Sequence, residues 1–136
     1  MILGLNVETS LLKLLENSKF EFFLTGSRFF GMAIDTSDYD FFTEDSFETA
    51  TFLLDHGFRE VVVTGYRDQN INRHFRATCP LVGQIDVQLV RDVTQKRDVQ
   101  MFLKRYGFGR PCDDLWNAMF DIYRCGRLRG ESEPRS

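Results

Sequence analysis

Residues 24–43 have the sequence LTGSRFFGMAIDTSDYDFFT, and they hold the strongest structural signals of the chain. The aromatic and apolar run Phe20–Thr25 predicts a buried strand that ends in a tight turn at Gly26. A second aromatic run, Tyr39–Thr43, predicts another strand, and residues 28–33 between the two runs add a helical turn. The segment therefore predicts two strands of one sheet, joined by a glycine turn and a loop.

Further elements are expected outside this segment. The spacing of apolar residues predicts helices over residues 7–18, from Ser46 to Gly57, over 93–105 and over 113–125. Strands are expected at Phe58–Thr64, Arg73–Thr78 and Gly83–Val90, the last two as a hairpin around residues 79–82. This order predicts an α+β fold with a mixed β-sheet and helices packed mainly on one face. We expect a single domain over residues 1–129, followed by a frayed C-terminal tail at 130–136.

The chain has 136 residues, of which 43% are hydrophobic and 27% are charged, and this composition is typical of a folded protein. A net charge of -3 and a pI near 5.4 argue against a protein that coats nucleic acid by bulk electrostatics. Cys79, Cys112 and Cys125 have no CxxC spacing, so we expect reduced core thiols and no disulfide framework or zinc knuckle. The first residues show no charged region or long apolar run, which predicts a cytoplasmic protein with no membrane partner.

Gly26 and Ser27 make a turn that suits a phosphate group. Glycine lets backbone N–H groups approach phosphate oxygens, and serine adds a hydroxyl donor at a helix N-terminus. A Gly-Ser pair at the end of a strand is also common turn chemistry, so the neighbouring residues decide between the two interpretations. Asp38 and Asp40 follow after ten residues, and carboxylates beside a phosphate-binding turn are what nucleotidyl transfer requires.

Asp38 and Asp40 are candidate metal ligands. Because side chains alternate along a strand, these two acids are expected to share one face, while Tyr39 and Phe41 point into the core. Two carboxylates on one face can share a magnesium ion, which takes hard oxygen ligands.

Asp86 is the expected third ligand. It lies in the run Gly83–Val90, whose apolar side chains at alternate positions take the buried face. An acid in so apolar a strand is costly unless it meets a metal ion or a partner. Asp92, at the end of the same strand, is the residue most easily confused with it.

The order Gly26-Ser27-Arg28, then Gly31, then Ser37-Asp38-x-Asp40, resembles the signature of the DNA polymerase β nucleotidyltransferase superfamily. It is similar to the small bacterial and phage members, including the minimal nucleotidyltransferase antitoxins that AMPylate a partner toxin. The resemblance covers about residues 20–90, and Tyr39 departs from the aliphatic residue common between the two acids.

The resemblance implies a polymerase β-like fold and two magnesium ions, with Asp38 and Asp40 contacting both ions and Asp86 contacting one. Asp86 would also help to deprotonate the attacking hydroxyl. Gly26, Ser27 and Arg28 would hold a nucleoside triphosphate. The implied reaction joins a nucleoside monophosphate, expected to be AMP from ATP, to a hydroxyl acceptor such as a partner protein, and releases pyrophosphate.

A second function, from a different class, is a nucleotide-binding or catalytically silent protein of this fold that docks on and inhibits a partner protein. The short chain favours this alternative, because no second domain is evident to hold an acceptor. Nucleic acid is a weaker candidate partner, since an enzyme that modifies RNA would ordinarily carry a further RNA-binding domain.

The basic residues have two interpretations each. Arg28 is either a phosphate contact or a surface ion pair. His74 with Arg73 and Arg76 is either one edge of a pocket or a solvated edge strand. A charged helix face or a contact with triphosphate or nucleic acid would explain Lys96, Arg97, Lys104, Arg105 and Arg110.

Overall fold

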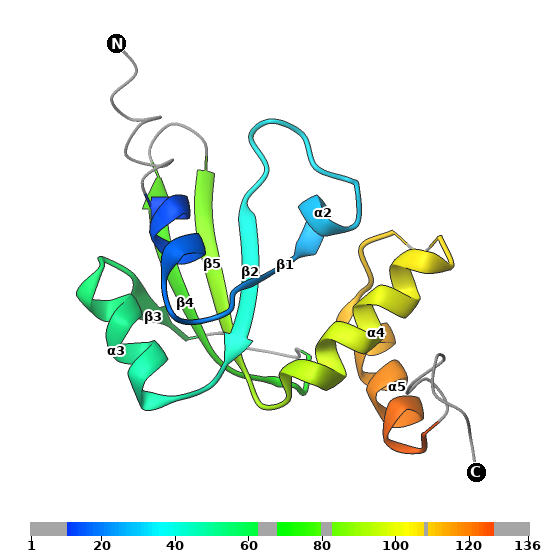
Figure 1. The fold of residues 1–136 in the computed structure, drawn as a ribbon. Coiled ribbons are helices and arrows are strands. Elements are labelled where there is room, and N and C mark those ends of the chain that lie inside the picture. The colour runs from blue at the N-terminus through cyan, green and yellow to red at the C-terminus, as the bar shows by residue number, and fades with distance from the viewer. Residues whose placement is uncertain (1–10, 63–67, 80–82, 108, 127–136) are drawn as a thin grey trace.

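The structure is a computed structural model, and it describes residues 11–62, 68–79, 83–107 and 109–126 (Figure 1). The expected tail at 130–136, the hairpin turn at 80–82 and the start of the first helix at 7–10 lie outside the described residues. In chain order the elements are a helix at residues 11–17, β1 (Phe23–Thr25), α2 (Gly26–Phe29), β2 (Tyr39–Glu44), α3 (Phe47–Asp55), β3 (Arg59–Val61), β4 (Ile71–Cys79), β5 (Gly83–Val90), α4 (Val93–Arg105) and α5 (Asp113–Arg124). The expected α+β class is confirmed.

The five strands form one mixed sheet in the order β1-β2-β5-β4-β3. β2 and β5 are parallel neighbours, and the other neighbouring pairs are antiparallel. The register of β2 with β5 aligns Asp40 with Asp86. The hairpin of β4 and β5, which the sequence predicts, aligns Arg76 with Asp86 from the other side. Two of the predicted acids and an arginine therefore occupy adjacent positions across three strands.

One face of the sheet carries a core that the helix at residues 11–17 and α3 cover (Figure 1). Its buried members include Leu15, Leu53, Phe75, Ile85, Val87 and Leu89. Tyr39 and Phe41 pack against this cluster, as the alternation along β2 predicts. Burying a side chain of this size contributes roughly 2 kcal/mol, so this face anchors the strands that carry the acids.

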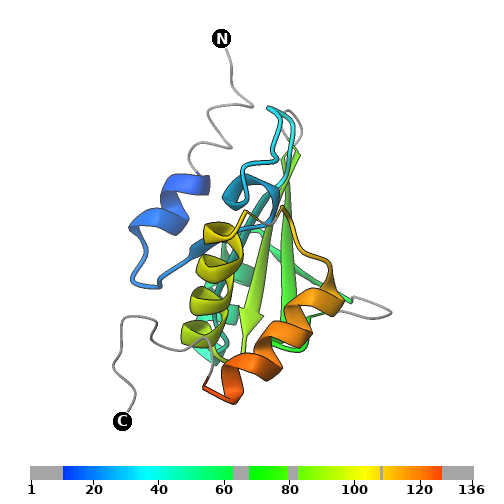
Figure 2. The same ribbon diagram turned by 90° about the vertical axis from the view of Figure 1, so that its right-hand side faces the viewer.

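The opposite side of the sheet is covered by α4 and α5 (Figure 2), which pack through a second apolar cluster. Gln100 of α4 donates a hydrogen bond to the carbonyl oxygen of Leu24 at 3.0 Å, and the Lys96 Nζ lies 5.4 Å from the centroid of the Phe42 ring. Helices therefore lie on both faces, and the expectation of helices mainly on one face is wrong. The reason is that Phe42 and Val90 share the face of Asp40 and Asp86, and their apolar surface needs a cover.

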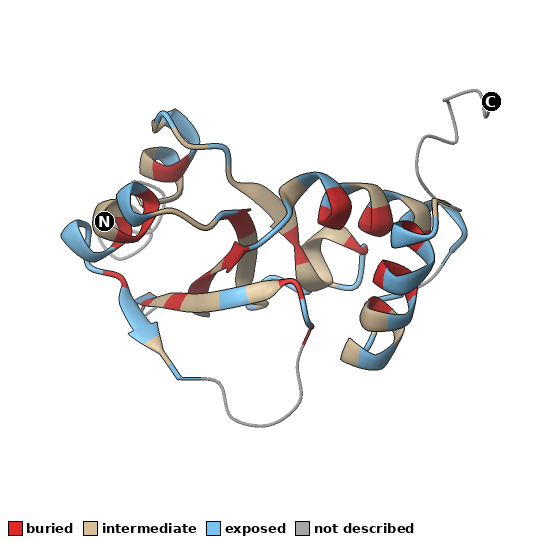
Figure 3. Ribbon diagram, turned by 90° about the horizontal axis from the view of Figure 1, so that it is seen from below, coloured by how far each residue is buried: buried red, intermediate tan, exposed pale blue. Residues whose placement is uncertain are grey.

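Burial follows this arrangement along the chain. Figure 3 shows buried residues along the central strands and on the inner sides of α4 and α5, with exposed residues on their outer sides. In α4 the buried side chains are Gln95, Lys96, Val99, Gln100 and Leu103, which is the periodicity of a helix with one buried stripe.

Local signals set the ends of α3. Ser46 caps the helix, because its Oγ accepts a hydrogen bond from the Thr49 backbone N–H at 3.0 Å. Gly57, with φ of +91°, follows the last turn and allows the chain to reverse. β1 and β3 are shorter than the runs Phe20–Thr25 and Phe58–Thr64 predict, and residues 63 and 64 lie outside the described part.

The cysteines differ from expectation in one respect. Cys112 and Cys125 are free thiols, as expected, but both are exposed, so the prediction of core thiols is wrong for these two. Cys112 precedes the first residue of α5 and Cys125 follows its last residue, whereas the buried side chains of this helix lie between positions 116 and 123. Across the residues that the structure describes, no helix combines the length and apolar character needed to cross a membrane.

Candidate active site

A cavity of about 540 Å³ lies at the amino-terminal end of β2, and its lining includes Ser27, Asp38, Asp40 and Asp86. β2 and β5 are hydrogen-bonded neighbours, so their aligned carboxylates must lie close together on one face. The structure thus brings the three predicted acids and the predicted serine to one cavity, although Asp38 and Asp86 are 48 positions apart in the sequence.

Gly26 lies directly against this group. Its φ is +70°, and a Cβ atom placed there would lie 2.2 Å from Asp40 Oδ2. Gly26 lines a smaller adjoining pocket of about 70 Å³, which shares Asp40, Gln88 and Arg110 with the larger cavity. The glycine is therefore needed both for the backbone turn and for the close approach of the Asp40 carboxylate.

Arg28 binds the backbone of the loop before β2. Its guanidinium donates hydrogen bonds to the carbonyl oxygens of Asp35 at 3.2 Å and Ser37 at 2.8 Å, and it stacks 3.9 Å above the Tyr39 ring. It is not among the residues that line the cavity. Arg28 thus holds the backbone that leads into Asp38, and the structure does not bring it to the predicted phosphate site.

Asp40 carries the most perturbed carboxyl of the cavity. Burial, together with the neighbouring carboxylates of Asp86 and Asp38, raises the pKa of Asp40 to about 6, and Arg110 opposes this rise. Removing this group from water and placing it beside like charges destabilises its ionised form. A cation bound between the carboxylates would relieve that repulsion.

Asp86 is bonded to one basic side chain of β4 and lies near a second. The Arg76 Nε donates a hydrogen bond to Asp86 Oδ1 at 2.8 Å, and His74 Nε2 lies 3.6 Å from the same oxygen, too far for a hydrogen bond. Burial alone would raise the pKa of Asp86, but His74 and Arg76 together outweigh burial and lower it. In this arrangement Asp86 is a carboxylate and a weaker base than an ordinary aspartate.

Asp38 is positioned by a single residue of β5. The Gln84 backbone N–H donates to Asp38 Oδ1, and the Gln84 side-chain amide donates to Asp38 Oδ2, both at 3.2 Å. These bonds fix the carboxylate just before the first residue of β2. They also turn it toward the start of β5.

The donor set fits magnesium by its chemistry, since the three acids offer hard carboxylate oxygens around one cavity. Within the described residues, no group of three or more His, Cys, Asp or Glu side chains is arranged so that it could hold a metal ion. In this arrangement Asp86 is bonded to Arg76, and Asp38 is bonded to Gln84.

Three further residues of the cavity carry donors: Arg76 and Arg110, for which the sequence left two interpretations open, and Gln88, which the sequence did not single out. The signal for Arg76 was available, because a hairpin around residues 79–82 aligns position 76 with position 86. Gln88 shares the face of Asp86 by alternation. Arg110 comes from the loop between α4 and α5, and no local pattern predicts that this loop lies over β2.

The other basic and acidic candidates have structural explanations. Asp92 is the N-cap of α4 and accepts a hydrogen bond from the Gln95 backbone N–H at 2.9 Å. Lys96 is buried in an ion pair with Asp68, so the charged-face interpretation is wrong for it. Arg97 lies over the Phe23 ring, and Lys104 lies over the Phe29 ring.

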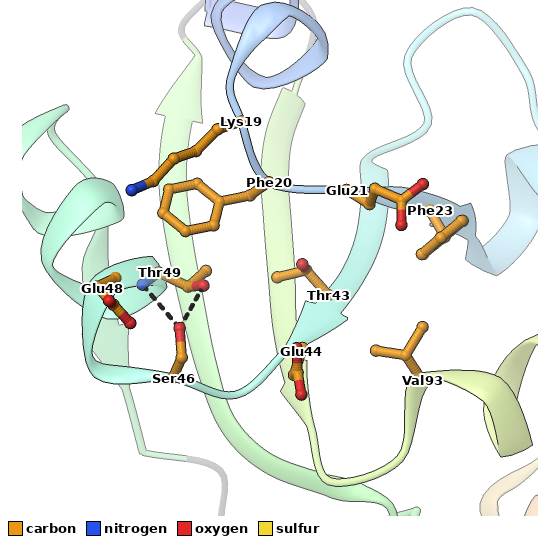
Figure 4. A pocket seen from close by; sticks show the side chains of 10 residues that line it. All are labelled: Lys19, Phe20, Glu21, Phe23, Thr43, Glu44, Ser46, Glu48, Thr49 and Val93. Carbon is orange, nitrogen blue, oxygen red and sulfur yellow. Dashed lines mark hydrogen bonds between the residues drawn. The ribbon is translucent and has the colours of Figure 1, made fainter.

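A separate pocket of about 430 Å³ lies at the other end of β2 (Figure 4). Its lining includes Thr43, Glu44 and the residues that begin α3. The hydroxyl of Ser46 is used for capping, since it bonds both the Thr49 backbone N–H and the Thr49 hydroxyl. None of the three predicted acids lines this pocket.

Comparisons of the chain with protein-family models, with curated protein sequences and with solved structures found no match in any of the three. The candidate site is therefore judged on its own geometry.

Proposed function

We propose that this protein is a magnesium-dependent nucleotidyltransferase of the polymerase β-like fold. It would transfer a nucleoside monophosphate, AMP from ATP as the first choice, to a hydroxyl acceptor. One observation carries the proposal: Asp38, Asp40 and Asp86 line a single cavity with Ser27, next to a glycine whose Cβ position the Asp40 carboxylate occupies.

The electrostatics of the cavity support a ligand that arrives with cations. Asp38, Asp40 and Asp86 would hold the magnesium ions, which supply positive charge against the oxygens of the reacting phosphate. Arg76 and Arg110 add positive charge on two sides of the acids. A triphosphate without a cation would meet three carboxylates, so binding is expected to depend on the divalent ion.

The proposed reaction is a displacement at the α-phosphorus of the triphosphate. The acceptor hydroxyl oxygen forms a bond to the α-phosphorus, and the bond from that phosphorus to the bridging oxygen of the β-phosphate breaks. Pyrophosphate leaves with the electron pair of the broken bond, and the hydroxyl proton passes to a carboxylate of the cavity. Ser27 and the Gly26 turn would hold the outer phosphates by hydrogen bonds.

The rim of the cavity suits the remainder of a nucleotide. Ile34 lines the cavity and is 70% exposed, so an apolar surface is available beside the acids. A nucleobase has an apolar face that would cover this side chain. A hydroxyl group on a partner protein remains the proposed acceptor.

Pyrophosphate release from each nucleoside triphosphate tests the proposal, with wild type compared with the double variant Asp38→Asn plus Asp40→Asn. Loss of both carboxylates should lower the rate at least about 100-fold, because the charge that stabilises the reacting phosphate is lost. Asp55→Asn, on the exposed end of α3, is the matched control and should keep the wild-type rate. Equal rates for wild type and the double variant would overturn the proposal.

A further inference from the structure

Gln88 is a residue of the cavity to which the reaction above gives no role. It lies on β5 two positions after Asp86, so both side chains point to the same face, roughly 7 Å apart along the strand. It lines both the large cavity and the smaller pocket beside Gly26. Gln88 therefore lies where the two spaces meet.

Lys96 fixes the orientation of the Gln88 amide. The Lys96 Nζ lies 2.7 Å from Gln88 Oε1 and 2.7 Å from Asp68 Oδ2, and Lys96 is 2% exposed. An ammonium group donates hydrogen bonds and accepts none, so the atom that faces it must be the amide oxygen. The amide NH₂ of Gln88 consequently points away from Lys96.

The NH₂ group of Gln88 is open to the cavity. Among the described residues, none accepts a hydrogen bond from Gln88 Nε2. The buried side-chain atoms without a hydrogen-bond partner in the described residues are Arg28 Nε, His74 Nε2 and Gln100 Oε1. Gln88 Nε2 is not among these buried atoms, so it is in contact with solvent. Gln88 lines both pockets, so the exposed part of its amide faces them.

The surroundings indicate which chemical group this donor meets. The two pockets share Arg110 and Gln88 together with the Asp40 carboxylate, which the magnesium ion would neutralise, and Gly26 lines the smaller pocket. A guanidinium group, an amide donor and a glycine turn around one space are suited to the oxygens of a phosphate group. The Lys96 ammonium behind the amide also polarises it, which strengthens its NH₂ group as a donor.

We propose that Gln88 is a phosphate-binding residue, whose NH₂ group donates a hydrogen bond to an oxygen of the part of the triphosphate that leaves as pyrophosphate. This inference rests on the proposed function and names a substrate contact within the same cavity.

Two substitutions separate the effect of the NH₂ donor of Gln88 on binding from the effect of the size of its side chain. Gln88→Glu keeps the size of the side chain and its contact with Lys96, but replaces the donor by an acceptor. Gln88→Met keeps the length and removes the donor without adding charge. The matched control, Gln69→Glu, adds the same charge at an exposed position that does not line the cavity.

The probe is inorganic pyrophosphate with magnesium, titrated calorimetrically, because it carries the phosphate contacts and no base or sugar. Both Gln88 variants should raise the Kd at least about 10-fold, since a hydrogen bond to a charged group contributes this much. Gln69→Glu should leave the Kd unchanged. Circular dichroism and the midpoint of thermal unfolding check that each variant is folded.

The outcomes separate this inference from the proposed function. If wild type binds pyrophosphate and both Gln88 variants bind it equally well, the inference is wrong and the proposed function stands. If only Gln88→Glu binds weakly, charge repulsion explains the loss, and the donor role is again wrong. If wild type itself does not bind pyrophosphate with magnesium, the nucleotide site and the inference both fail.

Discussion

Gly26 meets two conditions together that no residue with a side chain can meet. Its φ of +70° disfavours other residue types, and its Cα lies so close to Asp40 that a Cβ would overlap the carboxylate. Gly31 meets only the first condition, because its φ is +75° and no atom lies within 4 Å of its Cβ position. The pair therefore separates the backbone effect from the contact with Asp40.

Gly31→Ala should lower the free energy of unfolding by about 1–2 kcal/mol, the cost of a positive φ. Gly26→Ala should cost about 1–3 kcal/mol more, because the new methyl group must displace Asp40. Urea denaturation of the two variants measures the difference. Equal destabilisation by both substitutions would contradict the close contact between Gly26 and Asp40.

The raised pKa of Asp40 leads to a second prediction about a single residue. Its pKa in the folded protein, about 6, lies above the ordinary value of 3.8, so the folded state binds the proton more tightly than the unfolded state does. The ionised carboxylate therefore destabilises the fold above pH 6, and this penalty disappears as the pH falls from 6 toward 4. Asp40→Asn should raise the free energy of unfolding at pH 8 by on the order of 2 kcal/mol without divalent ions.

Chemical denaturation across this pH range checks the prediction. The stability gain of Asp40→Asn should shrink as the pH falls through 6. If the stability gain of Asp40→Asn stayed constant from pH 8 to pH 4, the pKa of Asp40 would not be raised in the folded protein. A variant that is more stable and inactive is typical of a functional group that the fold alone does not require.

Among single residues, the sequence predicted the position of the acids, and it predicted the contacts of the basic residues poorly. Alternation within a strand is a local rule, so it placed Asp40 and Asp86 on the correct face. Arg28 and Lys96 were not predictable in this way, because each is held by residues from another element or loop. The partner of Lys96 is Asp68, 28 positions earlier in the chain.

The start of α4 shows what one element contributes to the site. Asn70 accepts a hydrogen bond from the Asp92 backbone N–H at 2.8 Å and donates to the Asp92 carbonyl oxygen at 3.0 Å. Asp68 and Lys96 form an ion pair at 2.7 Å and are each 2% exposed. This buried polar network joins the segment before β4 to α4, and through Lys96 it reaches Gln88 in the cavity.

Lys96→Met should lower the free energy of unfolding by about 3–5 kcal/mol, because it leaves the Asp68 carboxylate buried without its partner. Asp68→Asn should be costly for the same reason. The double variant should be destabilised by less than the sum of the two single variants, since the unpaired charges are then both absent. Urea denaturation of the four proteins measures this coupling, and additive losses would contradict a buried ion pair.

At the element scale, α4 and α5 were predictable nearly to the residue. Their apolar periodicity is strong, and glycines and a proline separate them. The hairpin of β4 and β5 was predictable as well. The pairing of β2 with β5 was not, because parallel strands distant in sequence carry no local signal of their partner.

In the whole molecule, the two faces of the sheet differ: one carries the main core, and the other carries the residues of the cavity. Apolar side chains of β5 at positions 85, 87 and 89 build the core beneath the helix at residues 11–17 and α3. The opposite face is mixed: Asp40 and Asp86 line the cavity, while Phe42 and Val90 are buried nearer the carboxyl ends of β2 and β5. The prediction of helices mainly on one face was wrong because Phe42 and Val90 also need an apolar cover.

The proposed activity of this cavity is the transfer of a nucleoside monophosphate to an acceptor. The most direct test incubates the protein with ATP, magnesium and an extract of cells that contain it, followed by mass measurement of the proteins and RNA. The account predicts a mass increase equal to one AMP group on an acceptor with wild type, and none with Asp40→Asn. An increase that Asp40→Asn also produces, or no nucleotide-dependent increase on any molecule, would contradict it.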